Sequence, residues 1–249
     1  MAEMLGKTAI VTGAAHRLGR GIALALADVG VNIVVHYRNS DSDAESLRRE
    51  IEEKGVQCWK IQADLKDEKT CIGVIDDAFG DAKKVDFLIN NASVYESKDI
   101  MSAALEDLEK NFVVNAWAPF FLSRRFAAKN PSGKIINMID AHIDGYDFER
   151  FPYHSSKEAL ERITRSLALK FAPGMTVNAV SPGLILPLEG KDYSSIKSKE
   201  KEVPLKRHGE PENVADAVLF LLNSDFITGQ TIYVDGGAHL VHMVRGGNT

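Results

Sequence analysis

The sequence has few cysteines, no surplus of basic residues and no long apolar run, and each shortage excludes a class of protein. Cys58 and Cys71 are its only cysteines and lack a CxxC spacing, which favours reduced thiols in a reducing compartment over a disulfide framework. The chain has 30 lysines and arginines against 35 aspartates and glutamates. Its net charge of −5 offers no basic surface for phosphates, so we expect no nucleic-acid partner.

Signals for export, membrane insertion and metal binding are also missing. No apolar stretch approaches the ~18 residues of a membrane-spanning helix, and the opening MAEMLGKTAIVTG lacks the basic and apolar regions of a signal peptide. We therefore expect no membrane partner and a cytoplasmic location. The seven histidines show neither HxxxH nor HExxH spacing, so we expect no metal, with His239 and His242 solvated.

What the sequence does contain is a regular alternation of β-branched and amphipathic runs along its 249 residues. Seven runs are typical of strands: TAIVT, VNIVVHY, VQCWKIQ, VDFLIN, KIINMI, MTVNAV and QTIYVDGG. Apolar strands alternating with helices predict an α/β fold with a doubly wound parallel sheet, flanked by helices on both faces. No repeat, linker or low-complexity tract divides the chain, so we expect residues 1–249 to form one domain.

Residues 184–204, LILPLEGKDYSSIKSKEKEVP, form the least patterned segment. Doubly wound folds bind ligands at the carboxyl ends of their strands, where an insertion at this point of the chain would lie as a substrate lid. A solvated loop with a short helix is the alternative.

The first strand runs into TGAAHRLGRG, a turn that suits a dinucleotide. Gly13 and Gly19 let the backbone approach a pyrophosphate, whose charge the amides of the following helix can receive. Their spacing is wider than in GxGxxG, and Arg17 lies between them.

The second strand ends in HYRNS without the carboxylate that usually binds the ribose of NAD. Arg38 and Ser40 offer charge and hydrogen bonds to a 2′-phosphate, so NADPH is the expected cofactor. The alternative is that Arg38 is an ordinary exposed loop charge. Asp64 and Asn91 follow the next two strands, where the adenosine half would lie, although Asp64 could equally cap a helix.

The segment YHSSK places Tyr153 and Lys157 on one face of a predicted helix. An ammonium beside a phenol favours the phenolate, so we expect Lys157 to lower the pKa of Tyr153 and make it a general acid or base. A chance surface pair with this spacing is the alternative.

Six motifs occur in a fixed order: TG(x)5G, NNAS, the Asn115 of FVVNAWAPF, YxxxK, SPG and ITGQTIYVDGG. In this order they resemble the short-chain dehydrogenase/reductase family, from about Lys7 to Gly237. The resemblance implies one Rossmann-type domain that uses a nicotinamide cofactor, and a homotetramer in which the helices after Leu105 and Tyr153 pack across subunits.

The resemblance also implies roles for individual residues. Tyr153 would be the catalytic acid, Lys157 would bind the nicotinamide ribose, and Asn115 would hold a water in the proton relay. The cofactor would contact Gly13, Arg17, Leu18, Gly19, His36, Tyr37, Arg38, Asn39, Ser40, Asp64, Leu65, Asn91, Ala92, Ser93, Lys157, Pro182 and Gly183.

Asp140, in INMIDAHIDG, stands where most members of that family place a serine that polarises a carbonyl. An ionised carboxylate cannot donate a hydrogen bond and would repel a developing alkoxide, which disfavours ketone reduction unless Asp140 is protonated. A C=N bond suits it better, because a cationic heterocycle would be stabilised by a nearby carboxylate.

TGAAHRLGR, HYRNS, NNASVY and NMIDA resemble the pteridine reductases and dihydromonapterin reductase-like enzymes. That resemblance implies a pterin stacked between the nicotinamide and Tyr95. Ser93 and Arg17 would contact both cofactor and substrate, and Asp140 with Tyr153 would face the ring to be reduced. The alternatives are that Tyr95 covers the core and that Asp140 stabilises a loop.

The sequence thus predicts an NADPH-dependent reductase of a dihydropterin-like C=N substrate. One alternative is a 3-oxoacyl-thioester reductase or another carbonyl reductase, for which Ser would be expected at position 140. The other is a non-catalytic NADP-sensing protein, which would not need Tyr153, Lys157 and Asn115.

Overall fold

The computed structural model describes residues 4–143, 145–188 and 190–242, in which seven parallel strands form one sheet. Their order across the sheet is β3-β2-β1-β4-β5-β6-β7. The strands are β1 (Thr8–Val11), β2 (Asn32–Tyr37), β3 (Cys58–Gln62), β4 (Phe87–Asn90), β5 (Gly133–Met138), β6 (Met175–Pro182) and β7 (Thr231–Val234). Each of the seven predicted runs overlaps one strand, so the predicted fold class is confirmed.

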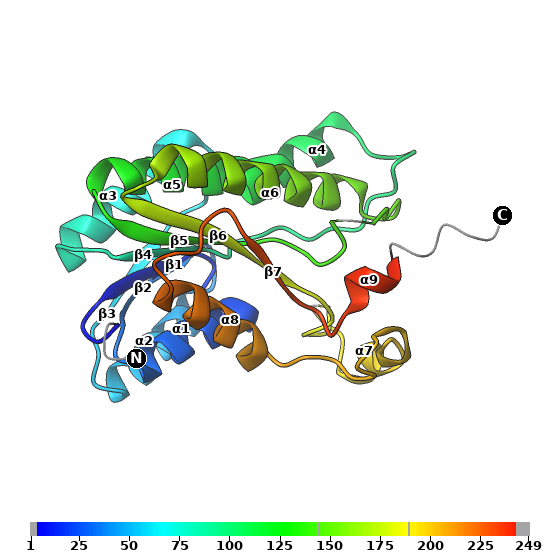
Figure 1. Cartoon of the computed structure of the whole chain (residues 1–249), viewed down its shortest axis with the longest axis horizontal. Helices are drawn as coiled ribbons and strands as arrows, with labels where there is room; N and C mark the ends of the chain where they lie inside the picture. Colours follow the sequence, from blue (N-terminus) through cyan, green and yellow to red (C-terminus); the bar gives the residue numbers. More distant parts are fainter. Residues whose placement is uncertain (1–3, 144, 189, 243–249) are drawn as a thin grey trace.

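Helices cover both faces of this sheet (Figure 1). One layer holds α1 (Arg17–Asp28), α2 (Asp41–Glu53) and α8 (Pro211–Asn223), and the other holds α3 (Glu68–Ala82), α5 (Ala118–Lys129) and α6 (Phe151–Phe171). Side chains of a strand alternate between the two layers. Ile33 packs in the α1 layer with Leu26, whereas Val34 packs in the α3 layer with Phe126. Both faces are therefore buried, which explains the nearly continuous apolar runs.

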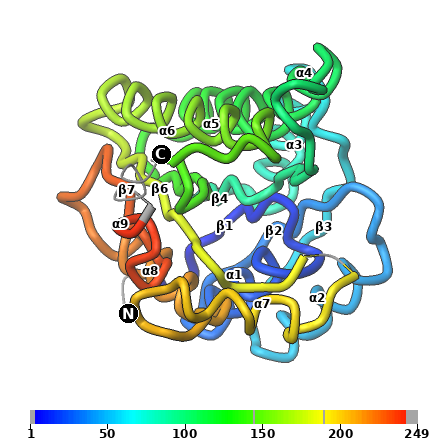
Figure 2. The backbone as a smooth tube through the Cα atoms, turned by 90° about the vertical axis from the view of Figure 1, so that its right-hand side faces the viewer, coloured from blue at the N-terminus to red at the C-terminus, as the bar shows by residue number. Residues whose placement is uncertain are grey.

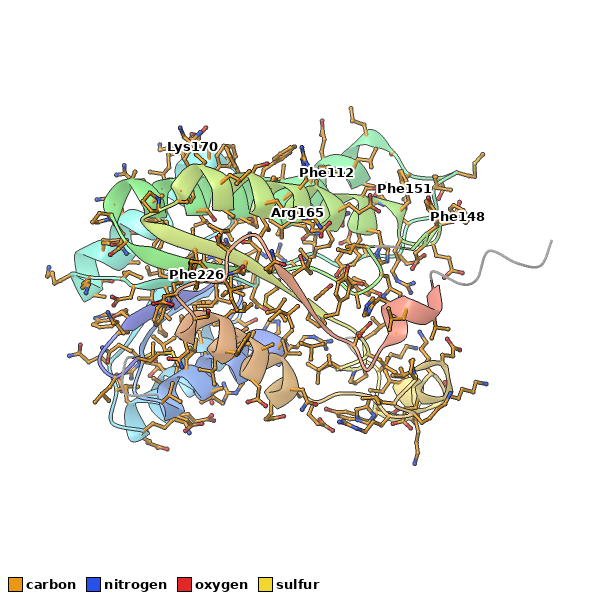
Figure 3. The ribbon with its side chains drawn as sticks, viewed as in Figure 1. Phe112, Phe148, Phe151, Arg165, Lys170 and Phe226 are labelled. Carbon is orange, nitrogen blue, oxygen red and sulfur yellow. The ribbon has the colours of Figure 1, made fainter. Side chains whose placement is uncertain are left out.

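The helical stretch expected after β4 is divided into three parts. It consists of α4 (Leu105–Phe112), a π-helical turn over Val113–Trp117 and α5. Single π-helical turns within helices are frequent at functional sites. Helix α6 follows on the same side of the sheet, with Phe151 at its first position and Lys170 near its last (Figure 3).

The site region lies where the strands end. Strand β1 pairs with β2 on one side and with β4 on the other, so the order of the strands reverses at this point of the sheet. A crevice opens at the carboxyl edge of such a reversal. Figure 2 looks onto this edge, where α7 (Ser194–Lys197) and α9 (Ala238–His242) lie in front of the sheet. Among the described residues, no helix combines the length and apolar character needed to cross a membrane.

Candidate functional site

A cleft of about 800 Å³ opens at the carboxyl edge of the sheet. The segments after β1, β2, β3, β4, β5 and β6 all contribute to its walls. The structure brings all of the predicted cofactor residues to this cleft: Gly13, Arg17, Leu18, Gly19, His36, Tyr37, Arg38, Asn39, Ser40, Asp64, Leu65, Asn91, Ala92, Ser93, Lys157, Pro182 and Gly183. Tyr95, Asp140 and Tyr153 line it as well. Their individual roles stay predictions.

The turn after β1 requires glycine at both predicted positions. Gly13 has φ +62°, in the left-handed region, and a Cβ on Gly19 would lie 2.3 Å from the Gly13 carbonyl oxygen. Thr12 fixes this turn to the loop after β4, because its Oγ accepts hydrogen bonds from the amides of Asn91 at 2.9 Å and Ala92 at 3.0 Å. In the sequence Thr12 was recognised only as part of the TG(x)5G motif, and its hydrogen bonds to the loop after β4 were not predicted.

His36 lies beneath the turn and is buried. Its Nδ1 accepts a hydrogen bond from the Gly13 amide at 3.2 Å, which places the proton on Nε2, 3.1 Å from the Ala63 carbonyl. Burial lowers the pKa of His36 to about 4. A neutral imidazole therefore joins the loops after β1 and β3, and both of its nitrogens are already used by the backbone.

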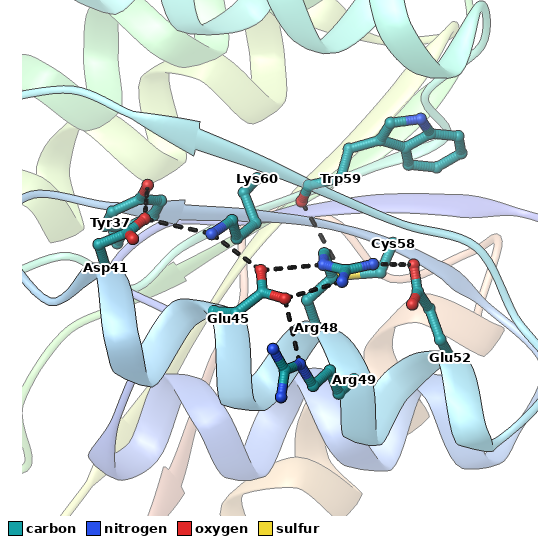
Figure 4. A network of polar contacts seen from close by, with 9 residues as sticks. All are labelled: Tyr37, Asp41, Glu45, Arg48, Arg49, Glu52, Cys58, Trp59 and Lys60. Carbon is teal, nitrogen blue, oxygen red and sulfur yellow. Dashed lines mark hydrogen bonds and ion pairs between the residues drawn. The ribbon is translucent and has the colours of Figure 1, made fainter.

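The end of β2 carries an uncompensated positive charge. Arg38 is exposed at the cleft and, in the part of the chain that the structure describes, forms no ion pair. The nearest carboxylate along the chain, Asp41, accepts a hydrogen bond of 2.5 Å from the Tyr37 hydroxyl and lies 3.1 Å from the Lys60 ammonium (Figure 4). Lys60 also lies 3.0 Å from Glu45.

The structure differs from one alternative, a helix cap at Asp64, and from one expectation, a solvated His239. Asp64 does not cap the helix after β3, because the Thr70 amide at the start of α3 donates to Asp67 at 2.8 Å instead. Asp64 lines the cleft. His239 is not a solvated side chain either: its Nδ1 lies 2.8 Å from Asp235 and its ring stacks on Tyr233. The side chain of His242 lies outside the described residues.

Arg17 links the turn after β1 to the segment predicted as a lid. It begins α1 with φ +56°, an unusual value for a residue with a side chain, and its guanidinium donates to the Pro187 carbonyl at 2.7 Å. The 184–204 segment also carries α7, whose Ile196 is buried and lines the cleft. The described part of this segment therefore lines the cleft, and its role as a lid stays a prediction.

The predicted catalytic residues meet at the end of β5. Tyr153 donates its hydroxyl proton to Asp140 Oδ2 at 2.9 Å, and Lys157 donates to the Met138 carbonyl at 2.8 Å. The Lys157 ammonium lies 5.7 Å from the centre of the Tyr153 ring.

This geometry contradicts the predicted direction of the tyrosine shift. Burial, together with the charge of Asp140, raises the pKa of Tyr153 well above 10, whereas Lys157 was expected to lower it. Burial also lowers the pKa of Lys157 to about 8. Burial, and after it the carboxylate at position 140, therefore keeps Tyr153 protonated.

His142 is the second partner of Asp140. Its amide and its Nδ1 donate to Asp140 Oδ1 at 2.8 and 2.9 Å. Burial opposes ionisation of Asp140, but the hydrogen bond and the positive charge of His142, with that of His154, outweigh it and lower the pKa of Asp140. Asp140 is therefore a carboxylate that can accept hydrogen bonds and attract a cation.

Asn115 is buried in the π-helical turn and does not line the cleft. Its Oδ1 accepts from Ser93 and Val94, and its Nδ2 donates to Val94 and Ser156. Its side chain therefore fixes the loop after β4 to α6 and has no hydrogen-bonding atom left for the expected water.

Tyr95 lies in the cleft and does not cover the core, because 45% of its surface is exposed. Its ring meets the Tyr153 ring edge to face, with centres 4.5 Å apart, and the Arg150 guanidinium lies 5.4 Å from its centre. Arg150 and His142 also line the cleft and were missed by sequence reasoning, although HID and DFER flank the signature residues. The described residues contain no cluster of ligands that could hold a metal ion.

The sequence and fold match a known family. A family model described as enoyl-(acyl carrier protein) reductase matches residues 13–239. The chain belongs to the short-chain dehydrogenase/reductase family. This confirms the family resemblance, and the protein is an oxidoreductase of a family that uses NAD(P)H.

Relatives of this short-chain oxidoreductase differ in substrate. It is 35% identical to the uncharacterized oxidoreductase YhdF of Bacillus subtilis, over 94% of this chain and 84% of that protein. It is 32% identical to the 3-oxoacyl-[acyl-carrier-protein] reductase FabG of Staphylococcus aureus, over 94% and 98% of the two chains. The crystal structure of FolM alternative dihydrofolate reductase 1 from Brucella canis, complexed with NADP, is 30% identical with a TM-score of 0.91, over 96% and 97% of the chains. Membership of the family therefore does not by itself determine the substrate.

Proposed function

We propose that this protein is an NADPH-dependent reductase of a dihydropterin-like C=N substrate. The observation that carries the proposal is the hydrogen bond between the Tyr153 hydroxyl and the Asp140 carboxylate. A proton donor and an anion meet at the cleft wall, which suits a heterocycle that gains positive charge as its nitrogen is protonated.

The charge at the end of β2 supports NADPH. Arg38 is exposed and without an ion pair among the described residues, and Tyr37 and Lys60 hold the nearby Asp41 carboxylate. The guanidinium can therefore bind a 2′-phosphate without competition. The related FolM structure is complexed with NADP.

When bound, the nicotinamide supplies the hydride. Tyr153 donates the proton to the substrate nitrogen, and Asp140 stabilises the positive charge of the ring. Tyr95 offers an aromatic face at the cleft, on which a flat heterocycle can stack. Lys157 is held near the Tyr153 ring by the Met138 carbonyl and lines the cleft, where it would contact the nicotinamide ribose.

Reduction of a 3-oxoacyl thioester is the second candidate, because a 32% identical relative carries that activity in its name. An alkoxide that develops beside the ionised Asp140 would be repelled, which makes this substrate less suitable. A non-catalytic NADP sensor is disfavoured, since it would not need a protonated Tyr153 at the cleft wall.

The variant Asp140→Ser tests the proposal. We expect the kcat for dihydropterin reduction to fall by about 100-fold or more, in the range of losses for a general acid–base group, because the ring cation loses its counter-ion. The Kd for NADPH, measured by fluorescence titration, should change little. An unaltered rate with dihydropterin would remove Asp140 from the mechanism.

A further inference from the structure

The start of α2 places a carboxylate directly after the predicted cofactor residues at the end of β2. Arg38, Asn39 and Ser40 line the cleft, and Asp41 follows them as the first residue of α2. A carboxylate at this point repels a phosphate bound at Arg38, and it can also pair with the guanidinium and compete with the phosphate. Binding of a 2′-phosphate therefore requires that the charge of Asp41 is offset by another group.

Two side chains from the sheet hold the Asp41 carboxylate (Figure 4). The hydroxyl of Tyr37, the last residue of β2, donates to Asp41 Oδ1 at 2.5 Å. The Lys60 ammonium donates to the same oxygen at 3.1 Å. These hydrogen bonds favour the ionised form and lower the pKa of Asp41. Asp41 is thus a fixed anion whose charge Lys60 offsets.

Lys60 is itself held in place on β3. The residue pairs with Val35 of β2, and 21% of its side chain is exposed. Its ammonium also lies 3.0 Å from Glu45, one turn further along α2. Arg48 donates two hydrogen bonds to Glu45, at 2.8 and 3.0 Å, so the charge of Glu45 is shared and Lys60 stays available to Asp41.

Neither Lys60 nor Asp41 is among the described residues that line the cleft. We propose that Lys60 strengthens the binding of a 2′-phosphate from outside the cleft, by holding the Asp41 carboxylate that otherwise opposes the phosphate at Arg38. Lys60 is a positioning residue, because it acts on the cofactor through Asp41. The inference rests on the NADPH part of the proposed function and is independent of the compound that the enzyme reduces.

Binding of nucleotide fragments tests the inference without turnover. The probes are adenosine 2′,5′-bisphosphate, which carries the 2′-phosphate, and adenosine 5′-monophosphate, which lacks it. Their Kd values are measured by isothermal titration calorimetry on the full-length protein. In Lys60→Gln the Kd of the bisphosphate should rise about 3- to 10-fold, as expected for one charge interaction near the surface, and the Kd of the monophosphate should stay nearly unchanged.

Removal of the carboxylate separates positioning by Lys60 from a direct contact with the phosphate. Asp41→Asn should bind the bisphosphate at least as tightly as the parent protein. The further change Lys60→Gln should then have no effect, because the ammonium has no carboxylate at position 41 to hold. A loss of affinity that persists in the double variant would mean that Lys60 contacts the phosphate or supports the fold, and would overturn the inference.

Tyr37→Phe releases the same carboxylate in a second way, because it removes the other donor and keeps the ring. It should also raise the Kd of the bisphosphate, and Asp41→Asn should again cancel the rise. Urea unfolding of each variant shows whether the fold is kept. A rise that Asp41→Asn does not cancel would contradict the role of Asp41.

The control is Lys54→Gln, which removes a lysine at the opposite end of α2, where its ammonium lies 2.5 Å from Asp28. It should keep both Kd values. An unchanged Kd of the bisphosphate in Lys60→Gln, or an equal rise in Lys54→Gln, would overturn the inference. A parent protein that binds both nucleotides equally would reject the 2′-phosphate site and the inference with it. Failure to reduce a dihydropterin would instead reject the proposed substrate and leave these Kd values to judge Lys60.

Discussion

At the residue scale, burial shifts the pKa values of the cleft groups in different directions, because it favours the neutral form of each group and therefore raises the pKa of an acid and lowers that of a base. Burial beside a carboxylate keeps Tyr153 protonated, and burial alone lowers the pKa of Lys157 to about 8 and that of His36 to about 4. The spacing of Tyr153 and Lys157 could be read from the sequence. The direction of the shift in the tyrosine pKa could not, since it depends on the burial of Tyr153 in the folded chain and on Asp140, which belongs to another element.

His36 makes stability depend on pH. Its native pKa of about 4 is below the unfolded value near 6.5, so the unfolded chain binds the proton first and stability is lost as pH falls through this window. We expect this group to remove about 2 kcal/mol between pH 7 and pH 5. Urea unfolding of the parent protein and of His36→Gln at both pH values measures it. Equal pH dependence in the two proteins would contradict the assignment.

Arg38 should determine the choice of cofactor. A charged hydrogen bond contributes about 1.5–3 kcal/mol, so Arg38→Ala should raise the KM for NADPH by roughly 10- to 100-fold and leave the KM for NADH nearly unchanged. Arg49→Ala is the matched control, because Arg49 is exposed on α2 outside the cleft. Similar effects on both cofactors, or a parent protein that prefers NADH, would reject the role of Arg38.

At the element scale, the turn between β1 and α1 depends on close backbone approach. In Gly19→Ala the new Cβ would lie 2.3 Å from the Gly13 carbonyl oxygen and 2.5 Å from Asn91 Nδ2, so NADPH binding should be lost and the melting temperature lowered. Gly73→Ala in α3 is the control, because a Cβ there meets nothing within 4 Å. It should stabilise the protein by about 0.4–1 kcal/mol. Calorimetry and NADPH titration of both variants measure these effects. Normal NADPH binding by Gly19→Ala would contradict the requirement for glycine at this position.

The elements themselves were easier to predict than their interruptions. The strands follow from β-branched runs, because a doubly covered sheet buries both faces of each strand. The π-helical turn around Asn115 has no local sequence signal, since it is held by the Val94 amide in the loop after β4 and by the Ser156 hydroxyl on α6. Asp67 rather than Asp64 caps α3 because only its carboxylate reaches the Thr70 amide.

At the scale of the whole molecule, the prediction of a homotetramer concerns the α4 and α6 side of the fold. Leu169 on α6 is 83% exposed, and α6 runs along the outside of its layer (Figure 3). Sedimentation at micromolar concentration should give four times the 27.4 kDa chain mass. Leu169→Asp should shift the protein to smaller species, whereas Leu5→Asp, at another exposed leucine, should not. A monomeric parent protein would reject the tetramer.

The arrangement of the whole molecule also explains how the site was predictable. Every strand is parallel, so residues as distant in sequence as Gly13, Asn91 and Asp140 reach one edge of the sheet. Family motifs identified these positions. His142 and Arg150 belong to no such motif, and their places follow only from the packing of the loop between β5 and α6.

The most direct test of the central claim follows NADPH absorbance with the purified protein, with a dihydropterin and an acetoacetyl thioester offered in parallel. The proposed function predicts turnover of the dihydropterin alone, because Asp140 suits a protonated heterocycle and repels an alkoxide. Turnover of the thioester alone would mean that Asp140 tolerates a carbonyl and would contradict the assignment to pterin reduction.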